Sequence, residues 1–255
     1  MMLLASTSAL GTIIFIVSAL FLALPVAAES ETAESVQPEG FYLDVDEVSI
    51  STGHFHTCAL ELRPGVDFGG PVKCWGYNDR GQASPPSGIL IQVSCGLRHT
   101  CGITSDETVS CWGDFTSPPD GLYTQVSSGE SHACALSKDG TLKCWGRNDF
   151  GESSPPEGHF VQVTCGQAIS CGLRRTGMVE CWGKNHLSQN SPPSNTTFKQ
   201  ISASIDHHVC GIAKDGDIIC WGNNNRAQSQ LQKGKVLWRH PIFMCKILST
   251  IQIDC

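Results

Sequence analysis

The sequence predicts an all-β fold in which small antiparallel sheets repeat along the chain. The first observation is composition, because 26 of the 255 residues are glycine and 13 are proline, which suits short strands and tight turns. The second is a repeat: the tripeptide Cys-Trp-Gly occurs five times, with its tryptophans 37, 33, 37 and 39 residues apart. The third is another cysteine before each tripeptide, ten residues upstream in four repeats and sixteen in the first.

The N-terminal segment predicts export. Residues from Ala9 to Leu24 are mostly apolar, and Val26-Ala27-Ala28 offers the small side chains that a signal peptidase accepts. We therefore expect residues 1–28 to be a cleaved signal peptide and the protein to be secreted. No Lys or Arg precedes the apolar run, which is atypical of a signal peptide. The alternative is an uncleaved membrane anchor with an extracellular domain, since about 18 or more apolar residues could span a bilayer. Both alternatives place the 14 cysteines outside the reducing cytosol, where disulfides are expected.

The repeats divide the rest of the chain. Residues 29–47 are expected to form a linker or a first strand, residues 48–228 the repeat domain, and residues 229–255 a divergent tail. The tail shows no repeat signature, so it is either a degenerate cap or the product of a truncated or mis-spliced reading frame. Each repeat starts with a strand-like segment, of which Ile91-Gln92-Val93-Ser94 is one copy.

The third repeat shows how the paired cysteines meet. Lys138-Asp139-Gly140 is expected to form a three-residue hairpin loop in which glycine takes the left-handed conformation. Counting outward from this loop pairs Leu136 with Leu142 and Cys134 with Cys144, in non-hydrogen-bonded positions whose Cα atoms approach to roughly 4.5 Å. The spacing thus predicts one disulfide across each hairpin. The ten cysteines involved are Cys58, Cys74, Cys101, Cys111, Cys134, Cys144, Cys171, Cys181, Cys210 and Cys220.

Two repeats depart from this template. The second has Glu107 where the third has its loop glycine, so it lacks the residue that this turn geometry favours. The first inserts six residues within the loop from Arg63 to Pro71. In every repeat the Cys/Leu face and the Ala/Trp face are both apolar, so each unit needs a neighbour on both sides, as in sheets stacked around an axis.

These residues resemble the short, cysteine-bearing version of the regulator-of-chromosome-condensation repeat family. The matching motif is Gly-x-x-His-x-Cys-Ala-Leu followed by Asp-Gly-x-x-x-Cys-Trp-Gly-x-Asn-x-x-Gly-Gln, seen at Gly53 to Leu60 with Cys74 to Gln82, and at Gly129 to Leu136 with Asp139 to Glu152. The resemblance implies a β-propeller, commonly of seven blades, whereas five units are recognisable here. It also implies a binding role, because similar repeats occur in exported bacterial proteins, in receptor-like kinase ectodomains of plants and in a secreted inhibitor of β-lactamases.

The repeated histidines are expected to be structural, each bonding a nearby backbone group at the start of its strand. They are His56, His99, His132 and His208, with Ile169 in the fourth repeat. A metal site is the alternative, but Cys-x₂-Cys spacing is absent and we expect no metal or cofactor. The tryptophans are expected to pack between sheets. Cys95 and Cys165 are expected to be small buried side chains, and they remain unassigned together with Cys245 and Cys255.

The sequence favours a binding or scaffold protein over an enzyme. A net charge of −7 gives no attraction to nucleic acid, and no catalytic arrangement stands outside the repeat motif. Arg63, Asp67 and Phe68, in the inserted loop, are the expected contacts to an extracellular protein or glycan. Asn195 lies in an N-glycosylation motif. The alternatives are a truncated ectodomain of a receptor-like kinase, a guanine-nucleotide exchange regulator and a secreted enzyme.

Overall fold

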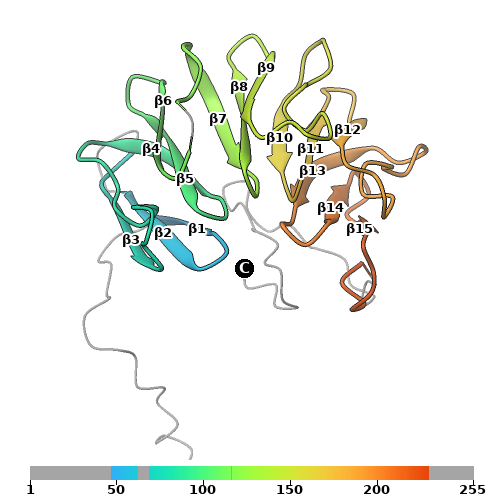
Figure 1. The fold of residues 1–255 in the computed structure, drawn as a ribbon. Coiled ribbons are helices and arrows are strands. Elements are labelled where there is room, and N and C mark those ends of the chain that lie inside the picture. Colours follow the sequence, from blue (N-terminus) through green and yellow to red (C-terminus); the bar gives the residue numbers. More distant parts are fainter. Residues whose placement is uncertain (1–46, 63–68, 116, 230–255) are drawn as a thin grey trace, which may run out of the picture. The chain divides into compact units, whose positions relative to one another are not determined.

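The computed structural model describes residues 47–62, 69–115 and 117–229, all of which belong to one compact unit, residues 44–255. These residues form five three-stranded antiparallel sheets, which follow one another in chain order (Figure 1). The predicted all-β architecture of repeated sheets is therefore confirmed. The predicted signal peptide, the predicted contacts Arg63, Asp67 and Phe68, and the predicted tail after residue 229 lie outside the described residues. None of the described residues belongs to a helix that is long and apolar enough to cross a membrane.

Each sheet has the same order, with its second strand in the middle. Sheet 1 contains β1 (Glu47–Thr52), β2 (His56–Leu62) and β3 (Val72–Gly76), and sheet 2 contains β4 (Leu90–Cys95), β5 (His99–Thr104) and β6 (Val109–Gly113). Sheet 3 contains β7 (Tyr123–Ser128), β8 (His132–Ser137) and β9 (Leu142–Gly146). Sheet 4 contains β10 (Gln162–Cys165), β11 (Ile169–Leu173) and β12 (Val179–Gly183). Sheet 5 contains β13 (Phe198–Ala203), β14 (His208–Ala213) and β15 (Ile218–Gly222).

The hairpin between the second and third strands has the predicted register. In sheet 3, Leu136 pairs with Leu142 and Cys134 with Cys144, around a turn in which Gly140 has φ +88°. The second sheet makes a similar turn although Glu107 replaces the glycine, because Glu107 itself adopts a φ of +63°. A disulfide crosses every hairpin, with Cα–Cα distances of 4.0–4.1 Å. These rungs hold sheets that are too small to be stable alone.

The core consists of the side chains between successive sheets. Between sheets 2 and 3, Ile103 and the Cys101 sulfur of one sheet pack against Tyr123, Val126 and Ala133 of the next. Similar clusters join sheet 1 to sheet 2, sheet 3 to sheet 4, and sheet 4 to sheet 5. The expectation that both faces of a unit are apolar and need neighbours is thereby explained: the Cys/Leu face packs on the Ala/Trp face of the following sheet.

Candidate functional site

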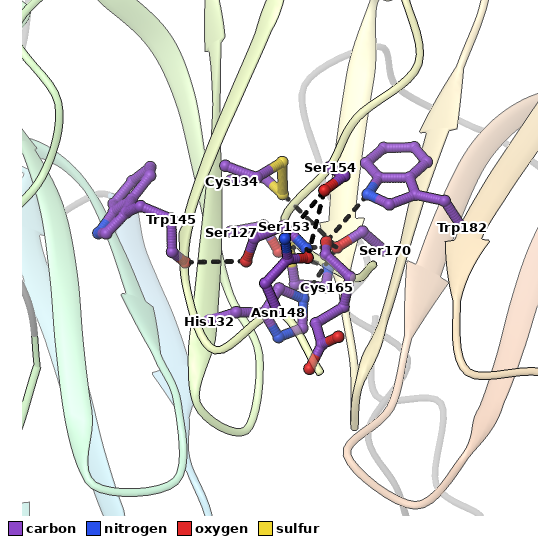
Figure 2. Close-up of a disulfide and its surroundings, with 12 residues drawn as sticks. Ser127, His132, Cys134, Trp145, Asn148, Ser153, Ser154, Cys165, Ser170 and Trp182 are labelled. Atoms are coloured by element: carbon purple, nitrogen blue, oxygen red, sulfur yellow. Dashed lines mark hydrogen bonds between the residues drawn. A yellow bond between two sulfur atoms is a disulfide. The ribbon is translucent and has the colours of Figure 1, made fainter. Parts of the chain in front are cut away.

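A hydrogen-bond network joins sheets 3 and 4 (Figure 2). His132 Nε2 lies 2.8 Å from Ser170 Oγ, and Ser170 donates its hydroxyl proton to the carbonyl of Glu152 at 3.0 Å. The indole of Trp182 donates to the same carbonyl at 2.9 Å. The Glu152 carbonyl therefore accepts hydrogen bonds from both polar groups of the following sheet, so that the buried hydroxyl and indole N–H each have a partner.

The junction between sheets 1 and 2 repeats this network with different residues. His56 Nε2 lies 2.8 Å from Thr100 Oγ1, and both Thr100 and Trp112 donate to the carbonyl of Gln82. The expectation that each histidine bonds a backbone group beside its own strand is therefore wrong for His56 and His132. Their partners are hydroxyl groups of the next sheet, 44 and 38 residues further along the chain.

The other two junctions differ in a correlated way. Between sheets 4 and 5 the histidine position holds Ile169 and the hydroxyl position holds Val209, so a fully apolar pair replaces the polar one. Between sheets 2 and 3, His99 faces Ala133 and instead stacks on Phe115, with ring centroids 3.8 Å apart. Sheet 2 lacks the Asn-x-x-Gly-Gln loop after its third strand, and Trp145 Nε1 and His99 Nε2 have no hydrogen-bond partner within the described chain.

A second set of bonds joins the first strands of successive sheets. Gln125 accepts from the N–H of Val163 and donates to its carbonyl, at 2.9 and 3.1 Å. Gln162 makes the same pair of bonds with Ile201. Nearby hydroxyls act in the same way: Ser127 accepts from the N–H of Cys165 at 3.0 Å. The Gln that recurs in the strand-like segment at the start of the repeats therefore links successive sheets by hydrogen bonds.

The first strands of all five sheets also line one cavity of about 150 Å³. Its lining is rich in small polar side chains, among them Ser51, Ser94, Ser127 and Thr164. Each of these four hydroxyls accepts a hydrogen bond from the backbone of the next sheet. Because these groups already have partners, the cavity offers few unsatisfied donors or acceptors to a ligand.

The two cysteines outside the rungs border this cavity. Cys95 and Cys165 are both buried thiols, as expected for small core side chains. Burial raises the pKa of Cys165 to about 11, despite hydrogen bonds from Ser170 and Ser127 that lower it. One group of possible metal ligands exists among the described residues, His56 with Cys58 and Cys95. Since Cys58 is bonded to Cys74, its sulfur is not a thiolate, and the group does not make a metal site in this state.

A continuous row of paired turns lies at one end of the sheets. In each sheet the residue after the third strand donates its N–H to the carbonyl of the turn before the second strand. We call these ten residues the turn row. They are Phe55 with Tyr77, Arg98 with Asp114, Ser131 with Arg147, Ala168 with Lys184, and His207 with Asn223.

Glycine makes the close spacing of these turns possible. A Cβ atom on Gly96 would lie 2.5 Å from the carbonyl oxygen of Gly129, and one on Gly129 would lie 2.6 Å from that of Gly166. Such distances are shorter than real Cβ contacts. Backbone bonds also join neighbouring turns, for example from Glu130 N–H to the Gly166 carbonyl at 3.1 Å. The backbone of the row is therefore fixed while its side chains differ from sheet to sheet.

The chemistry of the turn row changes along its length. At sheet 1 it is aromatic, with Phe55 62% and Tyr77 50% exposed. At sheets 3 and 4 it is charged, because it contains Arg147 and Lys184. The Lys184 amine lies 5.0 Å from the ring centroid of Phe150, which is beside the row. At sheet 5 the rings of His186 and His207 meet edge to face, and burial, followed by the charges of His186 and Lys184, lowers the pKa of His207. Exposed rings with adjacent charges on a rigid backbone are suited to binding a protein surface.

Sequence reasoning missed this row. The predicted contacts Arg63, Asp67 and Phe68 lie outside the described residues, and Asn195 is exposed on a turn before β13. A signal was present: within Gly-x-x-His of the first three repeats the residue before the histidine varies as Phe55, Arg98 and Ser131, while the glycine and the histidine recur. Variation at one fixed position of a repeat marks a side chain that does not serve the shared fold.

Comparison with known proteins agrees with this architecture. A family model described as "Regulator of chromosome condensation (RCC1) repeat" matches residues 90–117, 123–152, 160–189 and 198–228. A search of curated proteins gives no match.

Among solved structures, the ectodomain of the Physcomitrella patens receptor kinase CR4 is 29% identical, with a TM-score of 0.59 over 74% of this chain and 55% of that one. The CRINKLY WD40 ectodomain of Arabidopsis thaliana ACR4 is 24% identical, with a TM-score of 0.55 over 74% and 68%. Prp20p from Saccharomyces cerevisiae, whose binding to Gsp1p and histones has been described, is 17% identical, with a TM-score of 0.60 over 72% and 59%. The chain thus spans about half the length of the CR4 ectodomain. From its repeats, its sheets and these likenesses, the chain belongs to the RCC1 repeat family, with a propeller-like fold.

Proposed function

We propose that this protein is an extracellular binding module that contacts a partner protein through its turn row. The observation that carries the proposal is the contrast within the turns of sheets 1 to 3, where a backbone fixed by glycine presents exposed side chains that differ from sheet to sheet. Rigid backbone reduces the entropy lost on binding, and aromatic and charged groups at its surface supply contacts. The inserted loop from Arg63 to Pro71 remains a proposed second contact.

Two further observations support the extracellular part of the proposal. Five disulfides persist only in an oxidising compartment, and the N-terminal segment has the pattern of a signal peptide. The likeness to the CR4 ectodomain favours a second, related candidate, in which these sheets form part of a receptor ectodomain. The likeness to Prp20p is below 25% identity and concerns the fold alone.

Binding to intact cells that express the gene tests the proposal. Fluorescently labelled full chain, collected from the culture medium, is expected to bind these cells saturably, and protease treatment of the cells is expected to abolish binding. A turn-row variant, Phe55→Asp with Tyr77→Asp, is expected to bind at least about tenfold more weakly, because two exposed rings are lost.

The matched control changes the opposite end of the sheets. Lys138 and Asp215 lie in hairpin turns between second and third strands, so Lys138→Glu with Asp215→Asn is expected to leave binding unchanged. A chain whose Arg63–Pro71 loop is shortened to the template length measures the contribution of that loop. Equal binding by the turn-row variant and the wild type would refute the turn row as the contact surface. Binding that survives protease but not periodate would identify a glycan partner instead.

We also propose that Asn195 carries an N-linked glycan, since its side chain is exposed on a turn that a glycosyltransferase could reach. Treatment of the secreted chain with an amidase specific for N-glycans is expected to reduce its mass, and Asn195→Gln is expected to remove this change.

A further inference from the structure

Three sulfur atoms and an imidazole meet where sheet 1 packs on sheet 2. A ring nitrogen of His56 and the sulfurs of Cys58 and Cys95 all lie within 4.8 Å of one another. The three residues are 3%, 0% and 6% exposed. Cys58 is bonded to Cys74, whereas Cys95 is a thiol that donates to the carbonyl of Ser51 at 3.2 Å. A thiol from one sheet is therefore adjacent to a disulfide of the preceding sheet.

The hydrogen bonds of this junction determine the tautomer of His56. Thr100 donates its hydroxyl proton to the carbonyl of Gln82, so the proton between Thr100 and His56 must belong to His56 Nε2. Nδ1 then carries a lone pair. Within the described part of the chain this buried Nδ1 has no hydrogen-bond partner. The imidazole therefore has one free site for a proton, while burial lowers the pKa of His56.

We propose that Cys95 and the Cys58–Cys74 disulfide form a thiol–disulfide exchange site. Cys95 gives its proton to the His56 imidazole, and the resulting thiolate attacks Cys58 Sγ. A Cys58–Cys95 bond forms as the Cys58–Cys74 bond breaks, and the electron pair leaves on Cys74 Sγ, which takes up a proton from His56 through solvent. One S–H and one S–S bond are exchanged, so the step requires no oxidant or reductant.

The exchange changes what the molecule presents to solvent. The new bond links β2 to β4 and so joins two sheets covalently, whereas the original bond lies within sheet 1. The thiol moves from buried Cys95 to partly buried Cys74 on β3. Cys74 then becomes a site for covalent modification by small disulfides or thiol-reactive molecules outside the cell.

The junction between sheets 3 and 4 provides an internal control. Cys165 Sγ and Cys134 Sγ both lie 3.5 Å from Ser170 Oγ, so a thiol and a disulfide are again neighbours. Burial raises the pKa of Cys165 to about 11, and burial lowers the pKa of His132 to about 4 against the opposing effects of Glu152 and the Ile169 backbone. Burial lowers the pKa of His56 too, but His132 is the more deeply buried of the two imidazoles, so exchange at this second junction is expected to be slower.

Disulfide mapping of the full chain under native conditions tests the proposal. Oxidised protein from culture medium is incubated without reductant in N-ethylmaleimide, and samples taken over time are digested without reduction for mass spectrometry. Maleimide is expected to accumulate on Cys74 while the Cys58–Cys95 peptide pair appears in equal amount. An intact Cys58–Cys74 pair throughout, with label on Cys95 or on no cysteine, would overturn the proposal.

Three variants separate exchange from incidental labelling. Cys95→Ser is expected to abolish labelling of Cys74, whereas Cys165→Ser is expected to leave its rate unchanged. His56→Gln keeps a donor for Thr100 but removes the proton acceptor, so labelling of Cys74 is expected to slow at least about tenfold. Equal labelling rates for the wild type and Cys95→Ser would contradict the proposal. The readout does not involve a binding partner, so it stands apart from the proposed function.

Discussion

The repeated histidine illustrates how one residue serves different surroundings. His56 and His132 bond hydroxyl groups of the next sheet, while His99 is stacked on Phe115. Sequence reasoning identified these residues as structural but assigned them the wrong partners. A partner within the same hairpin can be read from spacing, whereas one 38 to 44 residues away depends on which faces of two sheets meet. The joint replacement by Ile169 and Val209 was the available signal.

Buried histidines predict a loss of stability in acid. Burial, followed by the charges of His132 and His56, lowers the pKa of His99 to about 3, and burial lowers the pKa of His132 to about 4. Both pKa values lie below that of an unfolded chain, about 6.5, so the unfolded state binds more protons between these limits. Stability is complete above pH 6.5 and declines as the pH falls towards 4 and then 3. Each histidine is expected to cost on the order of 3 kcal/mol at pH 4.

Thermal unfolding of the secreted chain at pH 7, 5.5 and 4 measures this effect. The double variant His132→Ile with Ser170→Val copies the apolar pair that already joins sheets 4 and 5, and it removes one of the titrating histidines. Its stability is expected to depend less steeply on pH than that of the wild type. Parallel pH profiles would show that His132 does not contribute.

At the scale of elements, the loops after the third strands of sheets 1, 3, 4 and 5 share one hydrogen-bonding design, with a different residue at one position of the third. In the loop from Asn78 to Ser84, Gln82 accepts from the N–H of Arg80 and donates to Asp79. In the third repeat Glu152 takes this position, fully buried, and only one of its carboxylate oxygens has a partner within the described residues. The repeat motif includes this position, but it gave no indication that the side chain is buried.

Glu152→Gln is therefore expected to stabilise the protein by about 1 kcal/mol, because an amide removes a buried charge and supplies a donor in the place of an unsatisfied oxygen. Denaturant unfolding at pH 7 measures the change. The reverse substitution in the next loop, Gln189→Glu, is expected to destabilise by a similar amount, since Gln189 is equally buried. A neutral or destabilising Glu152→Gln would mean that the carboxylate has a partner of its own.

Over the whole set of sheets, the junctions are of unequal strength. Hairpin registers and disulfides were predictable because their partners lie within one repeat and turn geometry connects them. The difference in strength between junctions could not be predicted, because it depends on how Phe115 fills the space left by the missing loop of sheet 2. At the junction of sheets 2 and 3, two buried polar atoms, Trp145 Nε1 and His99 Nε2, have no partner within the described residues. Each such unsatisfied group costs about 1–3 kcal/mol.

Hydrogen exchange should reveal this weaker junction. The N–H groups of Val126 and Ser128 bond Gln92 and Ser94 across it, at 2.7 and 2.9 Å. The matching groups of Val163 and Cys165 cross the junction of sheets 3 and 4 with similar lengths. We expect the first pair to exchange about tenfold faster or more, since its junction opens more readily. Equal protection of both pairs would show that stacking of Phe115 on His99 compensates fully.

The histidine–hydroxyl pairing also limits how such a chain can gain or lose units during evolution. Deleting the fourth unit would bring His132 against Val209, and deleting the second would bring His56 against Ala133; both leave an imidazole N–H buried without an acceptor. Loss of the third unit would instead bring His99 opposite Ser170 and create a match that the present chain lacks. Whether two units can be neighbours depends on the pair of residues that meet between them, so one repeat cannot be moved without regard to the repeats beside it.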